Sequence, residues 1–275
     1  MYDAFAYVYD EFMDNVPYEG WGRMLRSILA GHGVEDGLLL DLGCGTGKLT
    51  RLMAEMGFDM IGVDSSEDML AVARGFGAEA SGQDIEEGAE DTSVSDDINE
   101  YSNVSNEGIL YLCQDMREFE LYGTVRAVYS LCDCMNYLTD REELVKVFKL
   151  VNNYLDPEGI FIFDLNSIYK FSEVLGNRTF AENGDDASYI WENRYDEDTR
   201  INEYYLTLFI EDEDGRYVKE NELHRQKGYT VDEVKEALTE AGLELLLLCD
   251  EDTRSVVTDT TERLLFVARE SGKKK

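Results

Sequence analysis

The stretch LLLDLGCGTG, residues 38–47, decides the fold. It begins with a short, continuous apolar run, which is typical of a parallel strand buried on both faces. It ends in glycines at alternate positions, which let the backbone pass close to a ligand and adopt dihedral angles that other residues avoid. A helix is predicted from Lys48 to Met56, so the glycines join a strand to a helix. In an open α/β sheet such a loop lies at the carboxyl ends of the strands, where ligands bind.

The rest of the chain continues this alternation of apolar strands and amphipathic helices. Besides 48–56, the predicted helices cover residues 19–31, 66–74, 141–154 and 231–241. Besides 38–40, the predicted strands cover residues 60–63, 109–113, 127–131, 160–163, 243–248 and 263–268. Strands that alternate with helices in this way predict a doubly wound α/β fold.

Two segments interrupt the alternation. Residues 79–108 hold ten acidic residues and no basic one, so we predict an acidic, disordered loop at 82–107. Residues 165–226 alternate apolar and polar side chains in three stretches separated by turns, which predicts an inserted antiparallel β subdomain. Its apolar stripe Tyr204–Ile210 is predicted to form the core of that subdomain, with a substrate pocket as the alternative. We therefore expect a core domain made of 1–164 and 227–275, with 165–226 inserted into it.

The charge balance limits the partners. The chain has 59 acidic and 25 basic residues and a net charge of −34, which disfavours binding to nucleic acid or to anionic membranes. No apolar run approaches the roughly 18 residues that span a bilayer. The acidic, aromatic N-terminus is unlike a signal peptide, so we expect a cytoplasmic protein. The sequence carries no signal for an oligomeric state.

Cysteine and histidine usage argues against a metal centre. The five cysteines form no Cys-x-x-Cys pair, and we expect them to be reduced thiols. With only two histidines in the chain, no histidine-rich metal site is expected.

The spacing around the glycine loop distinguishes between nucleotide ligands. Asp64 follows Gly47 by seventeen residues, at the end of the second predicted strand, where a carboxylate can accept hydrogen bonds from ribose hydroxyls. A nicotinamide site would need the spacing Gly-x-Gly-x-x-Gly. Counted from Gly43 or Gly45, the last glycine position holds Lys48 or Thr50, so the nicotinamide alternative is disfavoured.

Taken together, these motifs resemble the class I S-adenosylmethionine-dependent methyltransferases. The resemblance rests on DLGCGTG (41–47), FAYVYDEFM (5–13), GVDSSEDMLAVA (62–73), CQDMREF (113–119) and SLCDCMNYL (130–138). It implies a Rossmann-like, seven-stranded core and S-adenosyl-L-methionine as cofactor, with S-adenosyl-L-homocysteine as product. The β insertion is similar to the lid of small-molecule N-methyltransferases, including sugar N,N-dimethyltransferases.

The resemblance also implies a set of cofactor-binding residues. Asp64 would accept from the ribose, and Asp115 would lie near the adenine amino group. Asp41 would orient the loop or meet the cofactor's ammonium, with a simple helix-terminus contact as the alternative. Tyr9 and Tyr18 would close over the methionine end, or else serve as ordinary packing. The full set is Tyr9, Tyr18, Asp41, Gly43, Cys44, Gly45, Gly47, Asp64, Ser65, Met69, Asp115, Met116 and Cys132.

Catalytic residues are harder to identify because methyl transfer mainly requires alignment and exclusion of water. Asp133, after the fourth strand, is predicted to bind a substrate cation or to act as a base, or else to cap a turn. His224 is the second predicted base; it belongs to a His-x-x-Arg-x-Tyr-like string in which Lys227 replaces the arginine. The predicted substrate contacts are Asp133, Asn136, Tyr137, Asp164 and Asn166.

The sequence therefore predicts methyl transfer to a small molecule, with an amine nitrogen as the favoured acceptor. Four alternatives stay open at this point: an O- or C-methyltransferase, a methyltransferase that modifies RNA or protein, a nicotinamide oxidoreductase, and a non-catalytic module that binds the cofactor.

Overall fold

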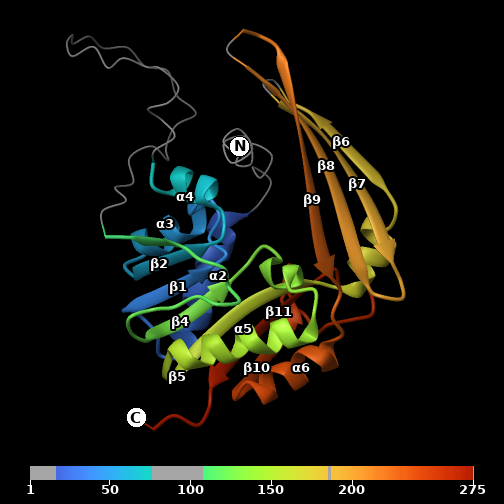
Figure 1. Ribbon diagram of the computed structural model, residues 1–275. Helices are drawn as coiled ribbons and strands as arrows, with labels where there is room; N and C mark the ends of the chain where they lie inside the picture. Colours follow the sequence, from blue (N-terminus) through green and yellow to red (C-terminus); the bar gives the residue numbers. More distant parts are fainter. Residues whose placement is uncertain (1–16, 76–107, 185–186, 213, 275) are drawn as a thin grey trace, which may run out of the picture.

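The computed structural model describes residues 17–75, 108–184, 187–212 and 214–274. The predicted acidic loop at 82–107 and the predicted cofactor residue Tyr9 lie outside the described residues. The described part confirms the predicted mixed α/β fold, in which a seven-stranded sheet carries an inserted antiparallel sheet of four strands (Figure 1).

The larger sheet has the strand order β10-β11-β5-β4-β1-β2-β3. The five strands from β5 to β3 run parallel, and β11 pairs antiparallel with both β5 and β10. The strands are β1 (Leu38–Leu42), β2 (Asp59–Asp64), β3 (Leu110–Cys113), β4 (Val125–Ser130), β5 (Leu155–Asn166), β10 (Leu243–Asp250) and β11 (Arg263–Glu270).

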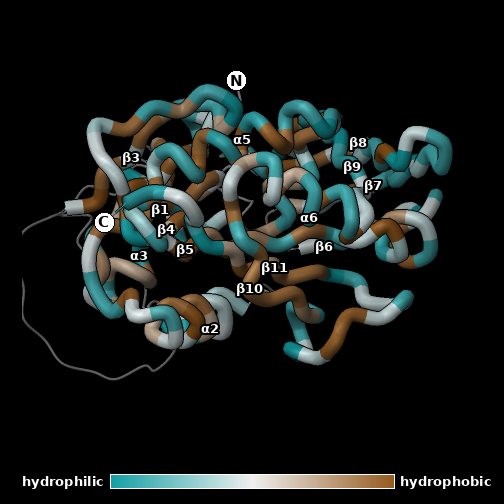
Figure 2. Tube along the Cα trace, turned by 90° about the horizontal axis from the view of Figure 1, so that it is seen from below, coloured by the Kyte–Doolittle hydropathy of each residue, from teal (hydrophilic) through white to brown (hydrophobic). Residues whose placement is uncertain are grey.

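Helices cover both faces of this sheet, as the apolar run in β1 predicts. Leu39 and Leu40 are each fully buried, and because successive strand residues face opposite sides they belong to two separate hydrophobic clusters. One cluster includes α2 (Tyr18–Gly31) and α3 (Lys48–Glu55). The other includes α5 (Arg141–Tyr154) and α6 (Val231–Glu240). The hydropathy colouring shows the same arrangement, with brown along β10 and β11 between the layers (Figure 2).

The starts of two elements, α4 and β5, show how the local sequence sets where an element begins. Helix α4 (Glu67–Ala73) begins after Ser66, whose side chain accepts from the Met69 N–H and caps the helix. Strand β5 begins at Leu155 rather than at the predicted Ile160. The sequence Asp156–Gly159 looks like a turn, but the structure accommodates it as a bulge, with Glu158 at a positive φ of 64° and a shift in the β4–β5 pairing.

The inserted sheet, which we call the lid, stands beside the core (Figure 1). Its strand order is β6-β7-β8-β9, all antiparallel. The strands are β6 (Thr179–Asn183), β7 (Ala187–Asp196), β8 (Ile201–Glu211) and β9 (Tyr217–Lys227), preceded by the π-helix η2 (Lys170–Leu175). The sequence predicted three of these strands. It missed β6, which is short and mostly exposed and so lacks an apolar alternation.

An ion pair connects the lid to the core at the turn between β7 and β8. Arg200 in that turn donates two hydrogen bonds, at 2.7 and 2.6 Å, to the carboxylate of Glu233 in α6. Glu233 also forms a capping box with Thr230 at the start of α6. The Arg200 guanidinium lowers the pKa of Glu233 to about 2. In the part of the chain that is described, no helix is long and apolar enough to cross a membrane.

Candidate active site

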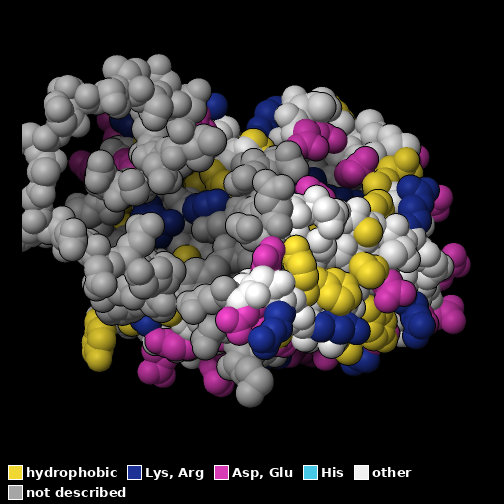
Figure 3. Space-filling view, turned by 90° about the horizontal axis from the view of Figure 1, so that it is seen from above, with side chains coloured by type: hydrophobic (Ala, Val, Ile, Leu, Met, Phe, Trp, Pro, Cys, Tyr) yellow, Lys and Arg dark blue, Asp and Glu magenta, His cyan; other side chains and the backbone are white. Residues whose placement is uncertain are grey.

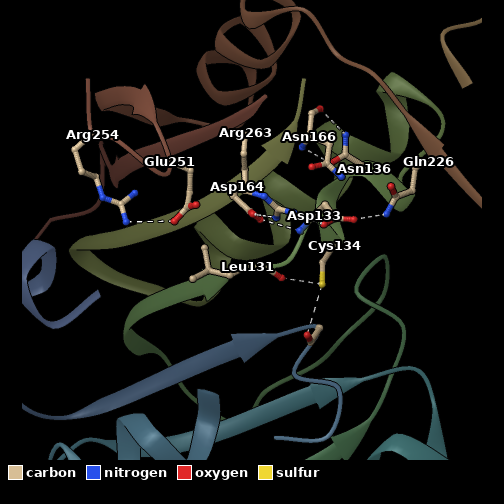
Figure 4. A network of polar contacts seen from close by, with 11 residues as sticks. Leu131, Asp133, Cys134, Asn136, Asp164, Asn166, Gln226, Glu251, Arg254 and Arg263 are labelled. Atoms are coloured by element: carbon tan, nitrogen blue, oxygen red, sulfur yellow. Dashed lines mark hydrogen bonds and ion pairs between the residues drawn. The ribbon is translucent and has the colours of Figure 1, made fainter. Parts of the chain in front are cut away.

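The candidate site lies where the strand order reverses, between β1 and β4. The chain leaves these two strands in opposite directions, which opens a crevice at their carboxyl ends. At the base of the crevice, polar contacts connect the end of β1 and its following loop to the end of β4 and its following loop. The Ser130 hydroxyl donates to the Leu42 carbonyl at 2.6 Å. The Cys134 thiol, which is labelled in Figure 4, lies 3.6 Å from the Gly43 carbonyl.

The glycines of the loop after β1 are required for two different reasons. All three have positive φ, at 87° for Gly43, 54° for Gly45 and 74° for Gly47. A Cβ atom at Gly43 would lie 2.7 Å from the Cys134 Sγ, and one at Gly47 would lie 2.6 Å from the Tyr111 hydroxyl. At Gly45 a Cβ would meet none of the described residues within 4 Å. Gly43 and Gly47 therefore allow the core to pack, whereas Gly45 leaves open space.

Asp64 holds this loop from the end of β2. One carboxylate oxygen accepts from the Gly45 N–H at 2.8 Å, and the other accepts from the Ser66 N–H at 2.9 Å. Burial raises the pKa of Asp64, and the backbone donors of Ser66 and Gly45 oppose that rise. A carboxylate has about four acceptor positions, so Asp64 retains acceptor capacity for a ligand.

Asp41 lies beneath the loop at the end of β1. Its carboxylate accepts from the Thr50 hydroxyl at 2.6 Å and from the Tyr129 hydroxyl at 3.1 Å. Burial raises the pKa of Asp41 to about 7, although these two donors lower it. Because Thr50 belongs to α3, Asp41 fixes the strand relative to the helix that follows the loop.

A cavity of about 910 Å³ opens above this loop and extends to the lid. Most of the predicted site residues that the structure describes line it. They are Tyr18, Asp41, Gly43, Cys44, Gly45, Asp64, Ser65, Met69, Asp115, Met116, Cys132, Asp133, Tyr137, Asn166 and His224.

Asn136 and Asp164, two of the predicted substrate contacts, do not line the cavity. Asp164 is fully buried, and its carboxylate accepts from Arg263 and from the Asp133 N–H at 2.9 Å. Asn136 is also fully buried and donates to the Lys227 carbonyl at 2.8 Å. Their polar groups hold other parts of the fold, so we do not propose direct substrate contact for either. Gly47 also lies outside the cavity lining, against Tyr111.

Asp133 lines the cavity, and its carboxylate already accepts hydrogen bonds from two side chains of the protein. One oxygen accepts from Arg263 at 2.9 Å, and the other accepts from the side-chain amide of Gln226 at 2.6 Å (Figure 4). Asp133 and the preceding Cys132 both have positive φ, at 53° and 64°. Arg263 also binds Asp164, so this arginine connects β11 to the ends of β4 and β5.

His224 reaches the cavity from β9 of the lid. Its Nε2 lies 2.8 Å from the Glu222 carboxylate, and its Nδ1 lies 3.3 Å from the Tyr137 hydroxyl. A carboxylate only accepts hydrogen bonds, so Nε2 carries a proton. In the neutral ring Nδ1 is then an acceptor, and the Tyr137 hydroxyl donates to it. The Tyr137 side chain is 44% exposed.

Asp115 lies at the opposite end of the cavity, after β3. Its carboxylate is held by the Arg117 guanidinium at 2.5 Å, and this arginine also binds Glu143 at 3.0 Å. The guanidinium lowers the pKa of Asp115. Met116 lies beside Asp115 in the cavity lining and also packs against the hydrophobic core.

Sequence reasoning missed a group of cavity residues that come from the lid and from β11. Tyr204, Leu206 and Leu208 share one face of β8 and line the cavity, so the interpretation of this stripe as lid core alone is wrong. The alternation of side chains along β8 showed that these residues share a face, but it did not show that this face meets the cavity. The other missed residues are Lys170, Tyr189, Trp191, Gln226, Glu251 and Arg263.

Comparisons with known proteins agree with this geometry. A family model described as a methyltransferase domain matches residues 39–97. The chain is 33% identical to a methyltransferase-family protein of Geobacillus sp. (strain WCH70), over 98% of this chain and 99% of that protein. It is 34% identical to the methyltransferase-family protein YqeM of Bacillus subtilis (strain 168), over 98% of each.

Solved structures show the same fold over the whole chain. A S-adenosylmethionine-dependent methyltransferase from Clostridium acetobutylicum ATCC 824 matches with a TM-score of 0.79 and 27% identity, over 98% of this chain and 99% of that one. The sugar N-methyltransferase KedS8 from Streptoalloteichus sp. ATCC 53650 matches with a TM-score of 0.71 and 19% identity, over 96% and 93%. The chain therefore belongs to the class I S-adenosylmethionine-dependent methyltransferases. It is an enzyme whose methyl donor is S-adenosylmethionine.

The residues of the site fit this donor. The open space at Gly45 and the remaining acceptor capacity of Asp64 lie side by side, because the Gly45 N–H is bonded to Asp64. The cavity volume of about 910 Å³ is at the upper end of the range for small-molecule sites, which leaves room for a second molecule beside the donor. The donor supplies an electrophilic methyl group, while the chain's own residues orient the acceptor and exclude water.

Proposed function

We propose that this methyltransferase acts on a small molecule and that the attacking atom is an amine nitrogen. The observation that carries the proposal is the lid side of the cavity, which is lined both by aromatic rings and by a histidine that has an acceptor nitrogen. The division of the chain into a core (1–164 and 227–275) and a substrate-binding lid (165–226) is part of the same proposal.

The aromatic wall suits an amine. Tyr189 and Trp191 come from β7 and Tyr204 comes from β8, and all three line the cavity, with the centroids of the Trp191 and Tyr204 rings 5.3 Å apart. The faces of such rings attract an ammonium or a methylated amine by cation–π interaction, by about 0.5–2 kcal/mol for each contact. The net charge of −34 adds long-range attraction for a cation and disfavours RNA.

His224 is the proposed base. At neutral pH an amine arrives mostly protonated, and it must lose a proton before nitrogen attacks the methyl group. Glu222 fixes the His224 tautomer so that Nδ1 accepts, and the Tyr137 hydroxyl is bonded to that nitrogen. A proton can therefore pass from the amine to the Tyr137 oxygen while the Tyr137 proton moves to His224. Asp133 is proposed to attract the amine, with its charge partly offset by Arg263.

The proposal includes a role at the cofactor for each of several residues, and their positions in the cavity support these roles. Asp64 is proposed to accept from the ribose hydroxyls and Asp115 from the adenine amino group. Asp41 is proposed to orient the glycine loop, which its bond to Thr50 supports. Tyr18 is proposed to close over the methionine end, with Lys48 above its ring at 5.5 Å. The remaining proposed contacts are Gly43, Cys44, Gly45, Ser65, Met69, Met116 and Cys132 at the cofactor and Asn166 at the acceptor.

A screen with methyl-labelled S-adenosylmethionine tests the proposal. Primary amines and the alcohols of matching skeleton are incubated separately, and labelled product and S-adenosylhomocysteine are measured. We expect turnover with amines and not with their alcohols. Turnover with alcohols alone would replace nitrogen by oxygen as the acceptor. Binding of S-adenosylhomocysteine without turnover of any compound would favour the non-catalytic alternative.

The His224→Gln variant tests the base. We expect kcat to fall by about 100-fold, as for loss of a general base, with the affinity for S-adenosylhomocysteine unchanged. The matched control is Asn221→Ala on the same strand, because Asn221 bonds to Thr207 and does not line the cavity. Equal kcat values in the two variants would remove His224 from catalysis.

A further inference from the structure

We infer that Lys170 binds an anionic group of the methyl acceptor, so that the acceptor carries a carboxylate or a phosphate in addition to its nucleophile. This inference rests on the proposed function, because it names the substrate class of the same cavity. It starts from a lysine that the sequence did not single out and that reaches the cavity from η2.

The backbone fixes where Lys170 begins. The Lys170 N–H donates to the Ser167 hydroxyl at 3.0 Å, directly after β5 ends. Lys170 is the first residue of a π-helix, a wide-turned element that is frequent at functional sites. The following Phe171 and Leu175 pack with Tyr204 and Trp191 of the lid. Lys170 therefore belongs to the lid side of the cavity rather than to the glycine loop.

The other cations that line the cavity have partners within the protein. Arg263 binds Asp133 and Asp164. Arg117 binds Asp115 and Glu143, and Lys48 lies over the Tyr18 ring. Within the described ranges, the Lys170 ammonium has no ion pair or hydrogen bond. Burying a positive charge away from water costs free energy unless the charge is paired. An anionic group of a ligand would supply the missing partner of this ammonium.

The charged groups around Lys170 do not supply that counter-charge. Asp133 and Asp164 are nearby, but both carboxylates already accept from Arg263, which lies between them (Figure 4). Glu262 is the third acid whose charge acts on Lys170, and its residue is exposed at the cavity edge. Burial and the neighbouring Arg263 lower the pKa of Lys170, as expected of a cation that lacks a partner.

The position of Lys170 indicates that the anionic group it binds belongs to the methyl acceptor and not to the methyl donor. In the sheet β4 lies between β1, which carries the glycine loop, and β5, which leads to Lys170. Lys170 is therefore two strands away from the loop that binds the donor. An acceptor with its amine beside Tyr137 and its anion at Lys170 would be held at two points, which fixes its orientation for in-line transfer.

Matched pairs of amines test the inference. Propylamine is compared with 4-aminobutyrate, and ethanolamine with phosphoethanolamine, at saturating labelled donor. We expect the anionic member of at least one pair to have about tenfold higher kcat/KM, mainly through KM, since one charge-assisted contact contributes about this much. Lys170→Met should reduce that ratio to about one, and Lys170→Arg should keep most of it. The control is Lys219→Met, an exposed lysine on β9 outside the cavity.

A ratio of one in the wild type, or a ratio that survives in Lys170→Met, would overturn the inference. A second readout does not depend on turnover. Lysines of the protein bound to S-adenosylhomocysteine are acylated with acetic anhydride, with and without sodium phosphate or sodium acetate, and quantified by mass spectrometry.

We expect at least one of the two anions to slow labelling of Lys170 severalfold and to leave Lys219 unchanged. Protection by S-adenosylhomocysteine alone would assign Lys170 to the donor, and no protection by either anion would overturn the inference. Anion protection without turnover of any amine would mean that only the proposed amine function has failed.

Discussion

The side-chain amide of Gln226 donates to the Asp133 carboxylate at 2.6 Å, and this contact joins the lid to the loop after β4. The amide orientation is determined because the carboxylate only accepts, so the Gln226 nitrogen faces Asp133. The Gln226 oxygen then accepts from the Tyr204 hydroxyl at 2.5 Å. A displacement of Tyr204 in the lid can therefore move the Asp133 carboxylate, because Gln226 bonds to both residues.

Replacing Gln226 tests this coupling. In Gln226→Leu the Asp133 carboxylate loses one of its two side-chain donors, and the Tyr204 hydroxyl loses its acceptor. We expect kcat to fall by about tenfold, the cost of one hydrogen bond to a charged group. The affinity for S-adenosylhomocysteine, measured by calorimetry, should stay within about twofold of the wild type. An unchanged kcat would show that the Asp133 loop is positioned without the lid.

Asp64 provides a test of the donor site. Asp64→Asn keeps the size of the side chain but removes its charge and turns one of its two oxygens into a donor. We expect S-adenosylhomocysteine to bind about 10–100-fold more weakly in calorimetry, because the ribose hydroxyls and the Gly45 N–H lose a charged acceptor. The control is Asp59→Asn at the exposed start of the same strand. If both variants bind equally well, Asp64 has no role at the ribose.

The open space at Gly45 gives a third prediction. In Gly45→Ala the new methyl group meets no atom of the part of the chain that the structure describes within 4 Å, so S-adenosylhomocysteine binding should fall sharply while the protein stays folded. Gly57→Ala is the control, because Gly57 also has a positive φ, of 97°, and open space but lies outside the cavity. Both variants should lose about 1–2 kcal/mol of stability from backbone strain. Equal affinity in both would exclude Gly45 from the donor site.

The raised pKa of Asp41 predicts that the free energy of unfolding depends on pH. Its pKa is raised from 3.8 to about 7, so between these values the folded protein holds a proton that the unfolded chain has lost. The contribution of Asp41 to stability is therefore greatest below pH 4 and falls as the pH rises to about 7. Urea unfolding of wild type and Asp41→Asn should show a wild-type advantage that declines by a few kcal/mol over this range. An advantage that grows with pH would contradict the assignment.

The local motifs could be predicted from sequence because their residues are close together in the chain. The apolar run of β1, the positive-φ glycines and Asp64 are such cases, since the strand–loop–helix geometry brings Asp64 to Gly45 whatever the rest of the chain does. Asp115 and Met116 also follow directly from the end of a strand. Each needed only a correct prediction of the neighbouring element.

Contacts between distant residues could not be predicted in the same way. Asp164 lies near the end of β5 and Asn136 follows β4, yet Asp164 is occupied by Arg263 and Asn136 by the Lys227 carbonyl, which lie 99 and 91 residues away. No local pattern marks Arg263 as the partner of Asp164 or Lys227 as the partner of Asn136. For the same reason the alternation in β8 located two faces, but only the packing of the lid against the core shows which one meets the cavity.

The turn after β4 has a consequence for evolution and engineering. Cys132 and Asp133 are consecutive residues with side chains in left-handed conformations, each of which costs roughly 1–2 kcal/mol relative to glycine. A search for thermostable variants would therefore select glycine at position 132 but not at position 133. Glycine at 133 would delete the carboxylate that accepts from both Gln226 and Arg263, and the loss of a partner for the buried arginine costs more than the strain. The strained backbone at Asp133 is retained because it maintains the junction between the two sheets.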